Sequence, residues 1–113
     1  MAGVRIIVNF QVEGEITDEF LRTWDSRFDD SRGDEGCLQF ELLRSVTQPD
    51  RFYLIERWQS RELLEKHWEI NQERRAKSPP PPGGGPQITA HGLEIYDHRL
   101  YHFDGRTLTP MED

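Results

Sequence analysis

Two polar residues stand where apolar side chains are expected, and both could take part in chemistry. Asn9 lies inside the alternating apolar segment 4–12, and His67 follows Leu63 and Leu64 at helical spacing, so its imidazole is expected to face the core. An amide in such a strand costs free energy unless it finds partners, and it could hold a substrate carbonyl or a developing oxyanion. The imidazole could act as a general base. The alternatives are a hydrogen bond from Asn9 to a loop or a dimer edge, and a packing role for His67.

Four aromatic side chains are candidates to surround a substrate near these two residues. They are Trp58, Trp68, Tyr53 and Tyr96. The tryptophans could line an apolar pocket, although aromatics at these spacings also form ordinary core. The tyrosines could donate a proton to a substrate oxygen, or lie at the surface or an interface. The prediction is therefore a site with Asn9 and His67 as catalytic residues and the four aromatics as substrate contacts.

We expect the other notable polar residues to have structural rather than catalytic or metal-binding roles. Glu56 and Arg57 occupy the middle of a predicted strand on opposite faces, which is typical of salt bridges across a hairpin or a dimer. His98 and His102 lie four residues apart in a predicted strand without a third ligand, so no metal site is expected. The single cysteine, Cys37, excludes an internal disulfide and is expected to be a packing thiol.

The elements that position these residues follow from the hydrophobic pattern. Alternating apolar residues predict strands over residues 4–12, 37–46, 52–59 and 93–103. The last of these is long enough to contain a bulge. One helix is predicted from an N-cap at Thr17 to Gly33, and another after an N-cap at Ser60.

This order predicts an α+β, ferredoxin-like βαββαβ fold with an antiparallel sheet and both helices on one face. Residues 1–113 are expected to form one domain, with a Pro/Gly-rich loop over 78–87 and a loosely ordered tail over 104–113. The loop could be a mobile lid over a pocket or a spacer without function. Because both sides of the strands carry apolar residues, the uncovered sheet face predicts a second copy and a two-fold homodimer.

Charge and composition exclude several classes of partner. The chain carries 21 acidic and 14 basic side chains, for a net charge of −7, which disfavours nucleic acid. No stretch approaches the roughly 20 apolar residues that a membrane span needs, and the first residues lack a signal-peptide pattern. We therefore expect a cytoplasmic protein that binds neither nucleic acid nor membrane.

Three segments together resemble the antibiotic biosynthesis monooxygenase (ABM) domain. They are the run Asp34-Glu35-Gly36-Cys37-Leu38, the strand from Phe52 to Trp58, and the run from Ser60 to His67. The resemblance covers residues 4 to about 70 well and the last strand loosely. It implies the dimeric α/β-barrel version of the predicted fold.

The resemblance also implies an activity. Enzymes of this family oxygenate without a metal, flavin or haem cofactor, and molecular oxygen is the co-substrate. Their substrates are commonly electron-rich polycyclic phenols, such as anthrone-type polyketide intermediates, which are oxidised to quinones. The implied function is a monooxygenase of a small aromatic molecule, with Asn9 as oxyanion donor and His67 as base.

Haem-degrading relatives place an asparagine, a tryptophan and a histidine around haem. Asn9 matches that asparagine, but His67 stands where the helix tryptophan is expected, and no histidine occurs between Trp68 and His91 to serve as axial ligand. Haem degradation is therefore not expected. Two alternatives stay open: a cyclase or isomerase that acts through an enolate in the same pocket, and a non-catalytic accessory dimer that binds small molecules.

Overall fold

The computed structural model describes residues 3–77 and 87–111, so residues 78–86 of the predicted Pro/Gly-rich loop lie outside the described residues. The elements in chain order are β1 (Val4–Glu13), α1 (Asp18–Arg22), α2 (Asp25–Arg32), β2 (Cys37–Arg44), β3 (Arg51–Trp58), α3 (Arg61–Lys77), β4 (Gln87–Asp97), β5 (Tyr101–Phe103) and β6 (Leu108–Pro110).

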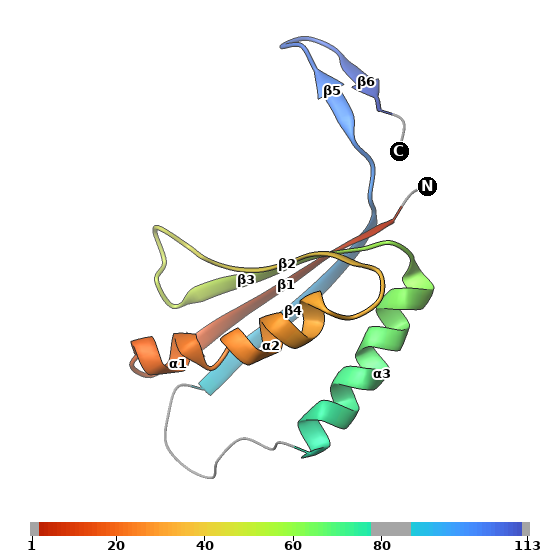
Figure 1. Ribbon diagram of the computed structural model, residues 1–113. Helices are drawn as coiled ribbons and strands as arrows, with labels where there is room; N and C mark the ends of the chain where they lie inside the picture. Colours follow the sequence, from red (N-terminus) through yellow and green to blue (C-terminus); the bar gives the residue numbers. More distant parts are fainter. Residues whose placement is uncertain (1–2, 78–86, 112–113) are drawn as a thin grey trace.

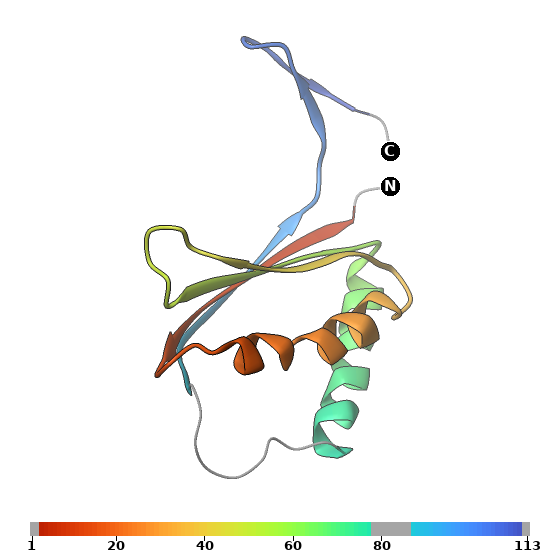
Figure 2. The ribbon, with the colours of Figure 1, turned by 60° about the vertical axis from the view of Figure 1, so that its left-hand side comes forward.

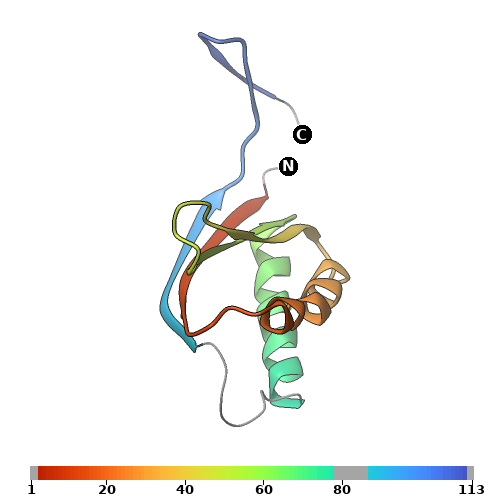
Figure 3. The same cartoon turned by 90° about the vertical axis from the view of Figure 1, so that its left-hand side faces the viewer.

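The first four strands form one antiparallel sheet in the order β2-β3-β1-β4, and β5 pairs with β6 in a separate hairpin. The helices α1, α2 and α3 lie on the same side of the larger sheet (Figures 1 and 3). The predicted ferredoxin-like α+β fold is therefore confirmed. We call the side under the helices the covered face and the other side the open face.

The covered face is built by the even-numbered residues of β1, which are all buried. Their cross-strand partners include Phe52, opposite Phe10, and Trp58, opposite Val4. Aromatic rings continue the core from the sheet into α2, with centroid distances of 5.5 Å for Phe52–Phe10, 5.5 Å for Phe10–Trp24, 6.2 Å for Trp24–Phe28 and 5.8 Å for Phe28–Phe40. Strand alternation thus defines the core as the sequence predicts.

The helix predicted from Thr17 to Gly33 is interrupted. Thr17 caps it as expected, since its Oγ1 accepts a hydrogen bond from the backbone N–H of Phe20 at 3.1 Å. The hydroxyl of Thr23, however, donates to the carbonyl of Phe20 at 2.6 Å. Such back-bonding competes with the helical ladder, and the chain turns between α1 and α2 at this point.

The C-terminal part of the chain also differs from the prediction. β4 begins at Gln87 and ends at Asp97, earlier than the predicted strand over 93–103, and its register against β1 shifts between Gln11 and Val12. Tyr101–Phe103 pairs instead with Leu108–Pro110, so His98 and His102 do not share a strand. Residues 104–111, predicted as tail, supply the turn and second strand of this hairpin.

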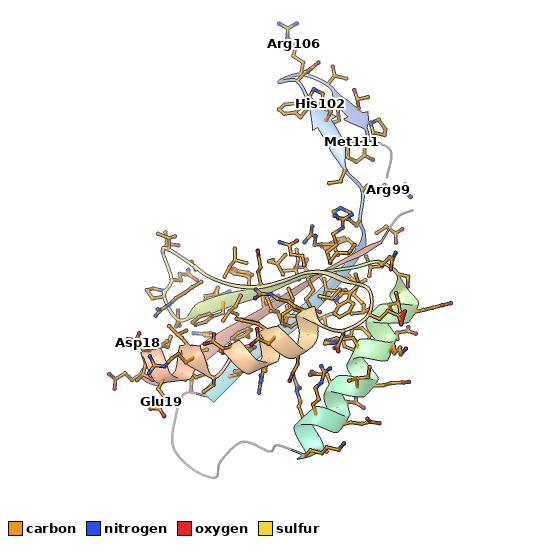
Figure 4. All side chains as sticks on the ribbon, viewed as in Figure 1. Asp18, Glu19, Arg99, His102, Arg106 and Met111 are labelled. Atoms are coloured by element: carbon orange, nitrogen blue, oxygen red, sulfur yellow. The ribbon has the colours of Figure 1, made fainter. Side chains whose placement is uncertain are left out.

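The β5–β6 hairpin stands off the body of the domain (Figures 1 and 2). The labelled residues His102, Arg106 and Met111 of this hairpin lie away from the larger sheet (Figure 4). Within the described residues, no helix is long and apolar enough to cross a membrane.

Gly36 fixes the entry into β2 and lies against α3. Its φ is +86°, and its carbonyl accepts a hydrogen bond from the backbone N–H of Gln59 at 2.8 Å. A Cβ at this position would lie 2.5 Å from Cδ1 of Leu63 and 2.8 Å from its Cβ. The position therefore requires glycine both for its backbone angle and for space.

We expect Gly36→Ala to lower the free energy of unfolding by about 1–3 kcal/mol, because the variant combines an unfavourable φ with a clash against Leu63. Chemical denaturation followed by circular dichroism measures this. Gly105→Ala is the matched control, since Gly105 has a φ of +99° but open space around an added Cβ. Equal midpoints for wild type and Gly36→Ala would contradict the prediction.

Candidate active site

His67 reaches the core because of how α3 begins. The hydroxyl of Ser60 accepts a hydrogen bond from the backbone N–H of Leu63 at 3.2 Å, which sets the first turn. Leu64 and His67 then face the sheet, and the His67 side chain is only 4% exposed. Its ring lies 4.5 Å from that of Trp58, centroid to centroid. The predicted inward orientation of this imidazole is confirmed.

A buried carboxylate holds the imidazole. Nδ1 of His67 lies 2.7 Å from Oδ2 of Asp34, which belongs to the loop between α2 and β2 and is 7% exposed. Arg74 donates to both oxygens of the same carboxylate, at 2.9 and 2.5 Å. Because His67 and Arg74 are two helical turns apart, both reach Asp34 from one side of α3. The trio links α3 to the loop that precedes β2.

Electrostatics favours a neutral imidazole beside an ionised carboxylate. Burial, the largest influence, lowers the pKa of His67 below its usual 6.5, although the hydrogen bond to Asp34 acts the other way. Burial acts to raise the pKa of Asp34, but hydrogen bonds from Arg74 and His67 outweigh it and leave that pKa below 3.8. Only a protonated Nδ1 can donate to this carboxylate, so Nε2 carries the lone pair. An imidazole in this state can act as a general base.

Glu56 is a residue whose position the sequence analysis missed. Expected in a salt bridge, it is 4% exposed on the covered face, where Oε1 accepts a hydrogen bond from Nε1 of Trp58 at 2.9 Å. Burial raises the pKa of Glu56. Burial also raises the pKa of the Cys37 thiol, and the negative charge of Glu56 raises it further. The sequence could have predicted this position, because Glu56 lies an even number of residues from Phe52 and Trp58 in the same strand and therefore shares their face of the sheet.

The structure separates the two predicted catalytic residues. Asn9 lies on the open face, opposite Tyr53 of β3 and Gly92 of β4, whereas His67 lies under the covered face. The expectation that they face one cavity is therefore wrong within one chain, because odd residues of β1 point away from the helices. A Cβ on Gly92 would lie 2.9 Å from Nδ2 of Asn9, so glycine there makes room for the amide.

The predicted aromatic contacts divide between the same two faces. Trp58 is fully buried and belongs to the core, and Trp68 is half-buried and packs against that core. Tyr53 and Tyr96 lie on the open face, where the Tyr96 hydroxyl donates to Oε1 of Glu94 at 2.6 Å. Of the four predicted aromatic contacts, two thus accompany His67 and two accompany Asn9.

A depression of about 340 Å³ lies along the β2 edge near this core. It is lined by Arg32, Cys37, Leu38, Gln39, Phe40 and Glu41. The ring of Phe40 also lies 6.1 Å from that of His67, centroid to centroid, but His67 itself does not line the depression. Over residues 3–77 and 87–111, no three His, Cys, Asp or Glu side chains are grouped to hold a metal ion.

Comparison with known proteins identifies the family of this chain. Residues 3–75 match the family model described as antibiotic biosynthesis monooxygenase. No curated protein matches the sequence.

Solved structures share the fold at low sequence identity. A protein from Shewanella oneidensis is 18% identical with a TM-score of 0.68, over 86% of this chain and 91% of that one. A protein from Methanosarcina mazei is 19% identical with a TM-score of 0.65, over 85% and 92%. The heme-degrader MhuD from Mycobacterium tuberculosis, solved with two hemes in its active site, is 23% identical with a TM-score of 0.65, over 86% and 96%.

The raised pKa of Glu56 predicts a specific pH dependence of stability. Its unfolded-state pKa is near 4.5, so above that pH the unfolded chain binds fewer protons than the folded one, and stability falls as pH rises through the folded pKa. Glu56→Gln keeps an acceptor for Trp58 but cannot ionise. We expect the melting temperature of Glu56→Gln, relative to wild type, to increase from pH 4 to pH 8.

Thermal scans at several pH values measure this difference. Glu62→Gln, at an exposed position of α3, is the matched control and should show no such trend. If the difference in melting temperature between Glu56→Gln and wild type is the same at every pH, Glu56 has the same pKa in the folded and the unfolded state, and the prediction is wrong.

Proposed function

This chain belongs to the antibiotic biosynthesis monooxygenase (ABM) family, and we propose that it is a cofactor-independent monooxygenase that oxidises an aromatic, anthrone- or phenol-type small molecule. The observation that carries the proposal is the buried imidazole of His67 with Nδ1 bound to Asp34 at 2.7 Å. This pair presents a neutral base at a low-dielectric position against aromatic rings.

The proposed oxidation requires mainly a base from the protein, because the substrate anion itself reacts with dioxygen. His67 removes the O–H proton of a phenol or enol, or a methylene proton of the keto tautomer, and the electron-rich anion then gives an electron to dioxygen without a metal or flavin. For an anthrone-type methylene, one oxygen atom becomes the new quinone carbonyl and the other leaves as water with the two methylene hydrogens. The imidazolium formed on the way is stabilised by Asp34, whose carboxylate stays ionised through its hydrogen bonds with Arg74.

The surroundings of His67 suit a flat, electron-rich substrate. The rings of Phe40 and Trp58 lie 6.1 and 4.5 Å from the imidazole, centroid to centroid, and half-buried Trp68 of α3 packs against the same core. Aromatic walls favour stacking with a polycyclic substrate and exclude water from the anion. A substrate would approach the imidazole past Phe40, which lines the depression of about 340 Å³ at the β2 edge. Asn9 has no role in this proposal because it lies on the open face.

We further propose that the protein works in the cytoplasm as a homodimer. The support for the dimer is the open face, where no described helix covers the sheet and half-buried Ile7 and Ile55 lie opposite each other. A sheet with apolar residues on both faces is stable when both are covered.

Oxygen consumption with an anthrone-type substrate tests the catalytic proposal. We expect His67→Ala to reduce the rate by about 100-fold or more, because it removes the base. His102→Ala is the matched control, since His102 lies on the distant hairpin (Figure 4) and should keep full activity. Product formed equally well under nitrogen would point to a cyclase or isomerase, and no thermal shift with any polycyclic phenol would favour an accessory dimer.

The pH profile separates a positioning role of Asp34 from a purely structural one. His67 must be neutral to act, so the rate falls as pH drops below its pKa, which Asp34 raises by hydrogen bond and charge. We expect Asp34→Asn to lower kcat and to move this acidic limb to lower pH. A lower kcat with an unmoved limb would show that Asp34 only supports the fold.

A further inference from the structure

Glu56 is a buried acidic side chain on the same face of the sheet as the proposed base. It is 4% exposed, and its register position in β3 is directly opposite Phe40 of β2. Glutamate is almost never buried to this extent without a partner, because the loss of water costs free energy. An apolar side chain of similar size would cost the core less, so the acid at this position points to a contribution other than packing.

The partner of Glu56 is the indole of Trp58, which is fully buried. Oε1 of Glu56 accepts a hydrogen bond from Nε1 of Trp58 at 2.9 Å. An indole nitrogen only donates, and at 0% exposure it cannot use water as its acceptor. Oε1 can accept this bond whether the carboxyl group is ionised or protonated on its other oxygen. The contact therefore persists through the titration of Glu56.

The same indole lies against the proposed base. The ring centroids of Trp58 and His67 are 4.5 Å apart, and the ring planes differ by 31°. This distance is typical of stacked aromatic pairs and also of a cation over an aromatic face. The indole therefore shields one face of the neutral imidazole, and the same contact stabilises the imidazolium that forms when the base takes up a proton.

Asp34 and Trp58 constrain the imidazole in different ways. The hydrogen bond at Nδ1 fixes the direction of one ring nitrogen, but the ring can still tilt about that bond. A ring stacked on the imidazole face opposes the tilt, so the two contacts together set the direction of the Nε2 lone pair. The rotation of the indole is limited in turn by its hydrogen bond to Glu56. The orientation of the base thus depends on Glu56 as well as on Asp34.

We propose that Glu56 is a positioning residue for the proposed oxidation: it holds the Trp58 indole against His67 and thereby keeps Nε2 of the imidazole directed at the substrate proton. The inference rests on the proposed function and adds a residue that acts on the base through another side chain, without transferring a proton itself. Misplacement of a reacting group by about 1 Å can cost about 100-fold in rate. Loss of the acceptor should therefore lower kcat and leave KM nearly unchanged.

Two substitutions of similar size, one with and one without an acceptor, test the proposal. Glu56→Gln keeps an oxygen for the indole N–H, whereas Glu56→Leu removes it. We expect Glu56→Leu to lower kcat for oxygen consumption by about 10- to 100-fold, and Glu56→Gln to stay within about 3-fold of wild type. Glu62→Leu, the same replacement at an exposed position of α3, is the matched control and should keep full activity. Equal losses in Glu56→Gln and Glu56→Leu would make Glu56 a proton donor and overturn the positioning role.

A double-mutant cycle with Trp58→Phe separates action through the indole from a general effect on the fold. Phenylalanine keeps a ring beside His67 but has no N–H for Glu56, so Trp58→Phe should also lower kcat. The double variant should be no slower than the slower single variant, because both substitutions remove the same hydrogen bond. Losses that multiply would overturn the proposal. If circular dichroism shows that Glu56→Leu is unfolded, Trp58→Phe decides, and full kcat in that variant would reject the proposal.

Proton NMR tests the geometry apart from the activity. The stacked indole should shift the ring protons of His67 upfield in the wild type. We expect this shift to persist in Glu56→Gln and to shrink in Glu56→Leu, and unchanged His67 signals in Glu56→Leu would overturn the positioning role. A wild type that consumes no oxygen with any phenol would overturn the proposed function, and the NMR result would then decide by itself whether Glu56 orients the imidazole.

Discussion

The buried carboxylate of Asp34 is the constraint on which the rest of the structure depends. An ionised group at 7% exposure is tolerable only with strong partners, and Asp34 receives hydrogen bonds from Arg74 and His67. Both partners belong to α3, whose buried residues are Leu64 and His67 alone. The apolar contact of this helix with the sheet is thus small, and the polar bridge gives it a defined position. The same hydrogen bond selects the tautomer of the imidazole, so one interaction sets both the fold and the proposed chemistry.

Strand alternation distributes the remaining polar residues between the two faces of the sheet. Along β3, Glu56 and Trp58 point to the covered face, and Arg57 between them points to the open face. Along β1, Ile6 and Val8 belong to the core while Asn9 lies with Tyr53 on the other side. A shift of one residue in either strand would exchange these sets. The sheet therefore keeps the buried groups around His67 apart from the charged side chains of the open face.

The sequence predicts the features that depend on residue type and spacing along the chain. It does not predict the features that depend on side-chain hydrogen bonds or on contacts between residues distant in sequence. The caps at Thr17 and Ser60 and the alternation of β1 follow from residue type and spacing. The break at Thr23 depends on one side-chain hydrogen bond, which helical periodicity does not reveal. Asn9 and His67 were grouped by chemical type although parity assigns Asn9 to the face away from the helices. Asp34 was not recognised as a partner of His67, because contacts between residues distant in sequence leave no periodic signal.

The division of the sheet also explains why a neutral base and a buried acid can coexist in so small a domain. Glu56, with its raised pKa, and the neutral His67 lie on the covered face, where burial favours uncharged forms. Asp34 stays ionised there because hydrogen bonds from His67 and from Arg74, which is 31% exposed, outweigh the effect of burial on its pKa. Arginine is suited to this task, since its charge persists at any working pH and its planar fork matches both carboxylate oxygens. A partly exposed cation thereby helps to keep the Asp34 carboxylate ionised beside the imidazole.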